Sequence, residues 1–268
     1  MLYEIFDHMH LCTDEAVREM LPLVSEQRRQ QALRYSHTFG RFCCLKSYLM
    51  LLELLSAVYP ELDTSKPEFG YTAQGKPFLL ARPDIHFSIS HTKNAILVAI
   101  SDAPIGVDIE AFRSPSAALI ARTMNATEQA AIAASAATAA SAATLEPLGT
   151  RISASGTPSG LLEPPGTAYG LGTPSGLLEP SGTPSGPGTP SGLLEPPGTA
   201  SGPGTPEALF SAIWTRKEAV LKLRGTGIEG DLREVLSGSE TILTRIFPRK
   251  GYAFSIAQQA ISPFEILH

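Results

Sequence analysis

The sequence predicts an α+β fold, on three observations. Segments with helical and strand periodicity are mixed along the chain, and the strand segments are short and clustered rather than alternating with helices. The chain has no glycine-rich phosphate loop of the mononucleotide or dinucleotide type, which disfavours a doubly wound parallel sheet. At 268 residues, 43% of them hydrophobic, the chain is long enough for one large or two modest domains.

The first part of the chain predicts a short strand, two helices and then a run of strands. The strand covers residues 3–8. One helix covers 25–34 and begins at Ser25 as N-cap, and the second, 40–59, is apolar on most faces and should be largely buried. Residues 68–79, which contain Gly75, are a strand or a turn, and three strands follow at 84–90, 95–100 and 105–110.

The second part predicts two helical segments and two strands. Residues 116–134 are helical with a break near Asn125, and 207–223 form a helix that ends on glycines at positions 225 and 227. Strands are expected near 240–247 and 251–257.

A tract of low complexity, residues 145–205, separates these two helical segments. It contains three near-identical copies of a 16-residue unit, which begin at residues 156, 172 and 188. Each unit carries four glycines, three or four prolines and a single Leu-Leu pair, too little apolar surface to offset the entropy lost on ordering. We therefore expect a disordered insertion that arose by duplication and is without chemistry of its own.

Composition excludes several classes of function. The net charge of −5 and the absence of a dense basic run predict no nucleic-acid partner. The cysteines at positions 12, 43 and 44 are too few and too poorly spaced for a disulfide framework or a zinc site. No signal peptide is visible, and the most apolar run, 48–59, is too short to span a bilayer, so a cytoplasmic protein without membrane contact is expected.

The stretch GVDIE, residues 106–110, sets two carboxylates on one face of a strand. Val107 and Ile109 point to one side, and Asp108 and Glu110 to the other, roughly 6–7 Å apart by the pleat repeat. Such a pair suits Mg²⁺, which takes one or two carboxylates together with substrate phosphates. Taken alone, however, the pattern is more typical of two solvated acids on an exposed edge strand.

Three further features are ambiguous when each is taken alone. His91, at the end of HFSISH, could donate to a phosphate or cap a turn, and Lys76, on the turn GKP, could contact a phosphate or water. Glu218 and Lys222 form an i,i+4 pair, which is usually structural. That pair lies beside an expected buried stripe formed by Phe210, Trp214 and Leu221.

Together and in this order, GKPF, FSISH, GVDIE and W-x-x-K-E-A-x-x-K-x-x-G-x-G resemble the motifs of the 4′-phosphopantetheinyl transferases of the surfactin-synthetase-activating type. The resemblance covers nearly all of the chain outside the repeat tract. It implies an enzyme that moves the phosphopantetheine arm of coenzyme A onto a serine of an apo acyl or peptidyl carrier protein and releases 3′,5′-ADP, with Mg²⁺ as cofactor.

The resemblance also implies roles for individual residues. Asp108, Glu110 and Glu218 would bind the metal, Glu218 would be the base, and Lys222 would donate to the phosphates, so that Asp108, Glu218 and Lys222 form the catalytic set. Contacts to coenzyme A would come from Arg28, Arg41, Lys76, Ser90, His91, Lys217 and Lys222. Gln31 stands where a second basic residue would be expected beside Arg28.

The implied fold has two similar α+β halves related by a pseudo-twofold axis, with the active site between them. Residues 1–104 would form the N-terminal half, and 105–144 with 206–268 the C-terminal half that carries the metal and catalytic motifs. A monomer is expected, and the insertion 145–205 would lie near part of the carrier-protein surface.

Two other functions are compatible with parts of the pattern. One is a non-catalytic protein whose repeat tract mediates an interaction, although such a protein has no physical reason to keep three convergent carboxylates. The other is a Mg²⁺-dependent enzyme that hydrolyses diphosphates, although such sites usually gather more acids, often on one helix.

Overall fold

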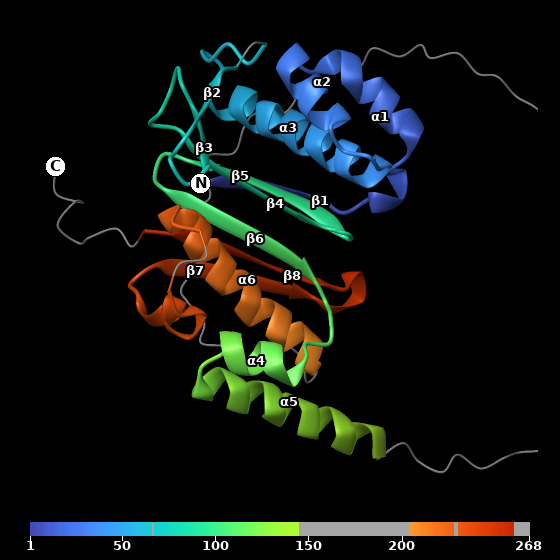
Figure 1. Ribbon diagram of the computed structural model, residues 1–268, viewed down its shortest axis with the longest axis vertical. Coiled ribbons are helices and arrows are strands. Elements are labelled where there is room, and N and C mark those ends of the chain that lie inside the picture. Colours follow the sequence, from blue (N-terminus) through green and yellow to red (C-terminus); the bar gives the residue numbers. More distant parts are fainter. Residues whose placement is uncertain (66, 145–203, 228–229, 260–268) are drawn as a thin grey trace, which may run out of the picture. The chain divides into compact units, whose positions relative to one another are not determined.

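The computed structural model describes residues 1–65, 67–144, 204–227 and 230–259 (Figure 1). The predicted mixture of helices and short strands is confirmed, and the strands pair in antiparallel fashion. The predicted repeat tract lies outside the described residues, except for Gly204 and Thr205. Thr205 belongs to the next helix as its N-cap, because its hydroxyl accepts a hydrogen bond from the amide of Ala208 at 3.2 Å.

The first sheet has the antiparallel order β1-β5-β4, formed by Leu2–Phe6, Ala95–Ser101 and His86–Thr92. Helix α3 (Thr38–Val58) packs on one face of it, and its buried apolar residues form one core with alternate residues of β5. Helices α1 (Asp14–Met20) and α2 (Glu26–Leu33) contact α3 in turn. The sequence analysis did not predict α1, whose N-cap is Thr13.

The second sheet has the antiparallel order β6-β8-β7, formed by Ile105–Ala111, Tyr252–Gln258 and Thr241–Phe247. Helix α6 (Pro206–Arg224) packs on one face, and helices α4 (Ala117–Thr123) and α5 (Ala126–Thr144) follow beyond it (Figure 1). The predicted break near Asn125 falls between α4 and α5 and is confirmed. Short 3₁₀ helices are formed by Met9–Leu11, Leu21–Leu23, Leu232–Ser237 and Pro248–Lys250.

A second core lies between the two sheets. It joins Ala95, Leu97 and Ala99 of β5 to the apolar residues of β6 and β8. Since Ile96, Val98 and Ile100 of β5 face α3, the strand is buried on both faces, which is the reason for the unbroken apolar run over residues 95–100.

Strands β4 and β6 are the facing edges of the two sheets, and hydroxyl groups join them. The Oγ atoms of Ser88 and Ser90 and the Oγ1 atom of Thr92 accept hydrogen bonds from the amides of Val107, Ile109 and Ala111 at 3.0, 3.3 and 3.1 Å. We call these three side chains the hydroxyl ladder. It satisfies amides of β6 that β8 does not reach and would otherwise be buried without a partner.

Helix α6 approaches β6 closely at Gly106. A Cβ atom on Gly106 would lie 2.1 Å from the carbonyl oxygen of Ala219 and 2.2 Å from the amide nitrogen of Leu223. The helix ends at Gly225, which has φ of +69° and closes the last turn as a left-handed cap. Glycine at position 106 therefore sets how near the residues of α6 come to the carboxylates of β6.

Strands β2 (Phe69–Tyr71) and β3 (Pro77–Leu79) pair as an antiparallel hairpin, which the sequence analysis did not predict, and Gly75, with positive φ, lies in the turn between them. Cys43 and Cys44 are buried and all three cysteines are free thiols, in agreement with the sequence. Trp214, expected in the buried stripe of α6, is only partly buried. Over the residues that the structure describes, no helix has the length and hydropathy needed to cross a membrane.

Candidate active site

Three elements bring their polar side chains together at Asp108. This carboxylate, on β6, is 6% exposed, and its Oδ1 atom lies 2.7 Å from the ammonium of Lys222 on α6. The hydroxyl of Ser90, on β4, donates to the same oxygen at 2.8 Å and accepts from Lys222 at 3.0 Å. Asp108, Ser90 and Lys222 thus form one hydrogen-bonded cluster where β4, β6 and α6 meet.

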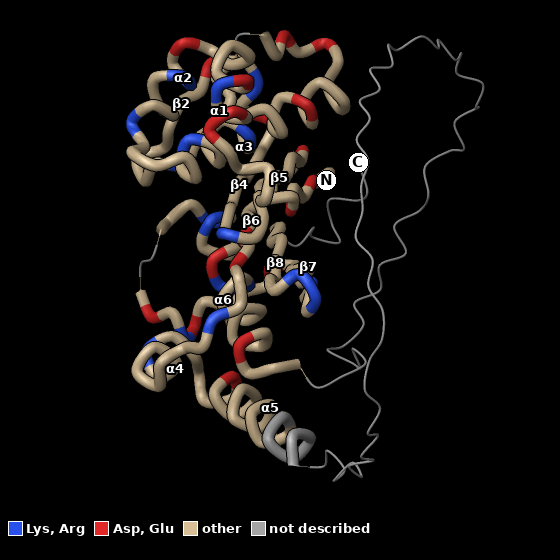
Figure 2. Tube along the Cα trace, turned by 90° about the vertical axis from the view of Figure 1, so that its right-hand side faces the viewer, with Lys and Arg blue, Asp and Glu red and all other residues tan. Residues whose placement is uncertain are grey.

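Glu218 and Glu110 are the other acids of this site, and both are partly buried. Burial raises the pKa of Glu218, and the charges of Asp108 and Glu110 raise it further, against the opposing effect of Lys222. The pKa of Glu110 is likewise raised by burial, opposed by Arg113 and reinforced by Asp108. Three carboxylates therefore lie close enough to repel one another (Figure 2 shows acidic and basic residues near β6 and α6).

Burial raises the pKa of Asp108, although Lys222 and Ser90 both favour its ionised form. Asp108 therefore depends on its two partners to carry a charge in a buried position. This arrangement explains why a lysine recurs one helical turn after Glu218, since Lys222 supplies the positive charge that the acids require.

Arg113 is a component of the site that the sequence analysis missed. Its guanidinium lies 3.3 Å from Glu110 and about equally far from two aromatic rings, 5.6 Å from the ring centre of Trp214 and 5.8 Å from that of Phe210. The tryptophan of the helix motif thus forms a platform that holds the arginine beside Glu110. Arg113 follows the end of β6, where no helical periodicity relates it to Glu110, so local spacing gave no signal for this pair.

The donor chemistry of Asp108, Glu110 and Glu218 fits a hard cation, because all their ligand atoms are carboxylate oxygens. The ammonium of Lys222 already places a positive charge against Asp108. With the side chains as placed, no group of three or more His, Cys, Asp or Glu residues within the described ranges is arranged to hold a metal ion.

His91 lies at the end of β4 and is exposed, with its ring edge-on to Phe39 at a centre-to-centre distance of 6.0 Å. The surrounding protein and the charge of Lys222 lower its pKa, so His91 lies within the electrostatic reach of the Asp108 cluster. Sequence order alone could not establish this proximity.

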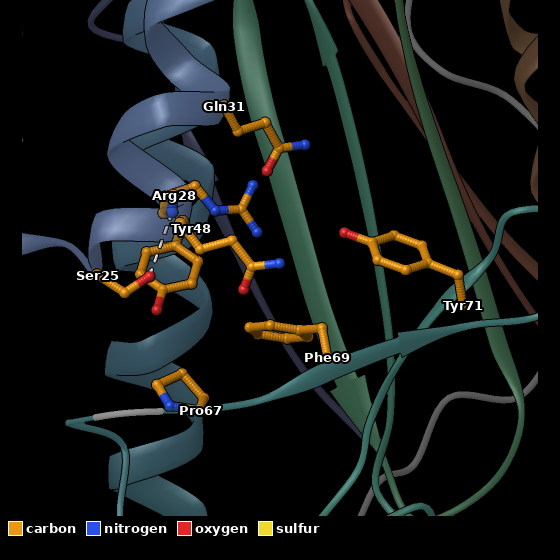
Figure 3. Close-up of a pocket in the computed structure, with 8 residues that line it drawn as sticks. Ser25, Arg28, Gln31, Tyr48, Pro67, Phe69 and Tyr71 are labelled. Carbon is orange, nitrogen blue, oxygen red and sulfur yellow. Dashed lines mark hydrogen bonds between the residues drawn. The ribbon is translucent and has the colours of Figure 1, made fainter.

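Arg28 lies in a separate pocket between α2, α3 and the hairpin (Figure 3). Its guanidinium stacks on Tyr48 at 4.5 Å from the ring centre, and Gln31 and Tyr71 point into the same space (Figure 3). Arg41 does not line this pocket, and its Nε atom donates to the carbonyl oxygen of Tyr35 at 2.9 Å.

The structure does not bring Lys76 or Lys217 to the carboxylate cluster. The ammonium of Lys76 donates to the carbonyl oxygens of Ile105 and Leu223 at 3.2 and 3.1 Å, and so joins the start of β6 to the end of α6. Lys217 is 1% exposed and points to the far side of α6, where its ammonium lies 2.7 Å from Glu128.

Glu128 is a second residue that the sequence analysis missed. It closes a capping box with Asn125 at the start of α5, with hydrogen bonds of 2.8 and 2.9 Å. The N-x-x-E spacing signals such a cap, but not the partnership with Lys217, which links α5 to α6.

Comparison with known proteins shows what the chain is similar to. No family model matches the chain. Five curated 4′-phosphopantetheinyl transferases are similar to it at 27–33% identity, which confirms the resemblance that the motifs predicted.

Among these relatives are the 4′-phosphopantetheinyl transferase Sfp of Bacillus subtilis (strain 168) and the enzyme gsp of Aneurinibacillus migulanus. The chain is 30% identical to the former over 127 residues, which are 47% of this chain and 56% of the relative. It is 33% identical to the latter over 87 residues, which are 32% of this chain and 35% of the relative. The aligned part thus spans about half the length, or less, of the curated relatives that it matches.

Proposed function

We propose that this chain is a 4′-phosphopantetheinyl transferase that moves the phosphopantetheine arm of coenzyme A to a serine of an apo carrier protein. The observation that carries the proposal is the meeting of Asp108, Ser90 and Lys222 from three elements, with Glu218 close by. The curated relatives support the class of reaction. The carrier could be an acyl or a peptidyl carrier protein.

In this reaction the serine oxygen forms a bond to the phosphorus that bears the pantetheine arm. The bond from that phosphorus to the bridging oxygen of the diphosphate breaks, and 3′,5′-ADP leaves. Glu218 takes the serine proton as general base, since its raised pKa brings it nearer to the working pH than an ordinary glutamate. Lys222 donates to the diphosphate and offsets the charge that develops on it.

A bound Mg²⁺, held by Asp108, Glu110 and Glu218, would further neutralise charge on the diphosphate. Arg113 orients Glu110 for that role through their contact at 3.3 Å. Arg28, His91 and Arg41 are proposed to hold the phosphates of coenzyme A. Arg28 lines the pocket beside β2, and His91 lies near the end of β4. Arg41 has to release the carbonyl oxygen of Tyr35 before it can take part.

The proposal extends to the architecture. Each sheet carries one long helix on its outer face, α3 on the first and α6 on the second, which supports two similar halves, 1–104 and 105–144 with 206–268, related by a pseudo-twofold axis. The Asp108 cluster then lies at the boundary between the halves, as expected for a site built from both.

The test is the intact mass of an apo carrier protein after incubation with the purified chain, coenzyme A and Mg²⁺. We expect a gain of one phosphopantetheine group, its loss with Glu218→Gln, and its retention with Glu53→Gln, an exposed glutamate on α3. No gain with acyl and peptidyl carriers, both for the whole chain and for a variant without residues 145–203, would refute the proposal.

A further inference from the structure

We propose that Ser90 is a positioning residue that orients Asp108 and Lys222, and that it does not bind the 3′-phosphate of coenzyme A. This inference rests on the proposed transferase function and departs from the direct contact that the motif resemblance implies. The evidence is the hydroxyl ladder of β4, and the hydrogen bonds that Ser90, its central member, forms with Asp108, Lys222 and the amide of Ile109.

The three members of the hydroxyl ladder share one structural task. Ser88, Ser90 and Thr92 alternate along β4, so their side chains lie on one face and reach successive outward-pointing amides of β6. Since the amides belong to alternate residues of β6, the ladder fixes the register of β6 against β4. This register decides which residue of β4 faces Asp108.

Only the central member has additional partners in the described structure. Besides the amide of Ile109, the hydroxyl of Ser90 contacts Asp108 at 2.8 Å and Lys222 at 3.0 Å. Ser88 and Thr92 hydrogen-bond to neither of these charged groups within the described ranges. Ser90 thus carries the same backbone contact as its neighbours and, in addition, connects both charges of the site.

The hydrogen-bonding capacity of Ser90 is fully used by these partners. A serine hydroxyl has one donor and two acceptor lone pairs. The donor goes to Asp108, since a carboxylate only accepts, and the two lone pairs accept from Ile109 and Lys222. A phosphate also only accepts, so Ser90 could contact one only by releasing Asp108, and at 7% exposure it offers little surface to a ligand.

The consequence is a fixed relation among three elements. The bond to the Ile109 amide anchors the Ser90 hydroxyl to the backbone of β6, beside the residue that it orients. Asp108 and Lys222 are then held to one oxygen atom, so their separation and direction follow from the register of the ladder. Residues held by such a shared partner reach the substrate without first having to reorganise.

The experiment compares Ser90→Ala with Ser88→Ala and Thr92→Val, each of which removes one ladder hydrogen bond. We expect comparable decreases in melting temperature for the three variants. Only Ser90→Ala should also lower the rate of transfer, by about 10- to 100-fold, the range that follows from losing hydrogen bonds to charged groups. The two neighbours should change the rate by less than about threefold, and Ser90→Thr, which keeps the hydroxyl as Thr92 does, should restore most of it.

The second measurement compares coenzyme A with 3′-dephospho-coenzyme A, in transfer rate and in calorimetric binding. Positioning predicts that Ser90→Ala weakens both ligands by the same factor. A contact with the 3′-phosphate predicts instead that the variant loses the preference for coenzyme A over the dephospho form. Loss of this preference would overturn the inference while leaving the transferase function intact. A transfer rate for Ser90→Ala equal to the rates of Ser88→Ala and Thr92→Val would do the same.

The transfer rate of the unaltered chain is the reference for both measurements. If the unaltered chain transfers no phosphopantetheine group, the inference and the proposed function are both overturned. If Ser90→Ala does not fold, Ser90→Cys provides the same comparison, because a thiol keeps the volume but is a weak donor.

Discussion

Replacement of Gly106 by alanine tests whether the close approach of α6 to β6 determines both stability and the site. The added Cβ would meet backbone atoms of α6, at 2.1 Å from the Ala219 carbonyl oxygen and 2.2 Å from the Leu223 amide nitrogen. Both distances lie far inside van der Waals contact. Because backbone atoms cannot rotate away as a side chain could, the helix must shift as a body or its last turns must deform.

Insertion of one methyl group into a well-packed interface typically costs about 1–3 kcal/mol, and backbone contact puts this site at about 3 kcal/mol or more. For a domain of this size a loss of 1 kcal/mol lowers the melting temperature by roughly 2–4 °C, so a decrease of about 6–12 °C is expected. The two clashing residues directly follow Glu218 and Lys222 in sequence, so the shift also draws these side chains away from Asp108.

The assay for Gly106→Ala is thermal unfolding followed by circular dichroism, combined with the carrier-protein mass assay well below the melting temperature. We expect the melting temperature to fall by about 6–12 °C. In protein that is still folded, the transfer rate should be at least about tenfold lower. Gly204→Ala is the matched control, because a Cβ there meets no atom within 4 Å and its φ is not positive. A melting temperature for Gly106→Ala within about 2 °C of the unaltered chain would refute the reasoning.

Three further predictions concern charged groups. Lys217→Met removes the ion pair with the partly buried Glu128 and the hydrogen bond to the Leu232 carbonyl oxygen, and should lower the free energy of unfolding by about 1–3 kcal/mol in urea titrations; an unchanged free energy of unfolding would contradict a structural role. Asp7 contacts Lys250 and the Tyr252 hydroxyl, and these contacts lower its pKa from the ordinary 3.8. Its contribution to stability is therefore present above pH 3.8 and lost as the pH falls through the lowered pKa. Asp7→Asn should destabilise the protein at pH 7, and the effect should shrink steadily as the pH is lowered below 3.8; an effect independent of pH would argue against the pair. Lys76→Met removes two hydrogen bonds that tie the end of α6 and should cost about 1–3 kcal/mol in the same titration, whereas unchanged stability would favour a ligand-only role.

Much of the fold could be predicted from local patterns. The N-cap at Ser25 and the C-terminal cap at Gly225 could be predicted from the sequence, because each depends on a few adjacent residues. The alternation of GVDIE correctly placed Val107 and Ile109 in the core, with Asp108 on the opposite face. Helix α1 was missed because its short span, with only Val17 and Met20 buried, gives little periodicity.

The site was predictable in its membership more than in its connections. Motif order singled out Asp108, Glu218 and Lys222. In the structure Asp108 forms an ion pair with Lys222, and the roles of all three residues stay predictions. The order of the motifs could not indicate that Lys217, adjacent to Glu218, points to the opposite side of the helix and pairs with Glu128. Contacts between residues far apart in the chain depend on packing, which a single sequence does not display.

The sequence by itself determined the class of fold, the periodic faces of the helices and strands, and the set of residues that resembles a transferase site. Each of these follows from local stereochemistry or from residues close together in the chain. Only the tertiary structure decided that the hydroxyls of β4 hold the free edge of β6, and that Gly106 admits α6 to contact distance. The physical reason is that these features are relations between segments more than fifteen residues apart, which exist only once the chain has folded and packed.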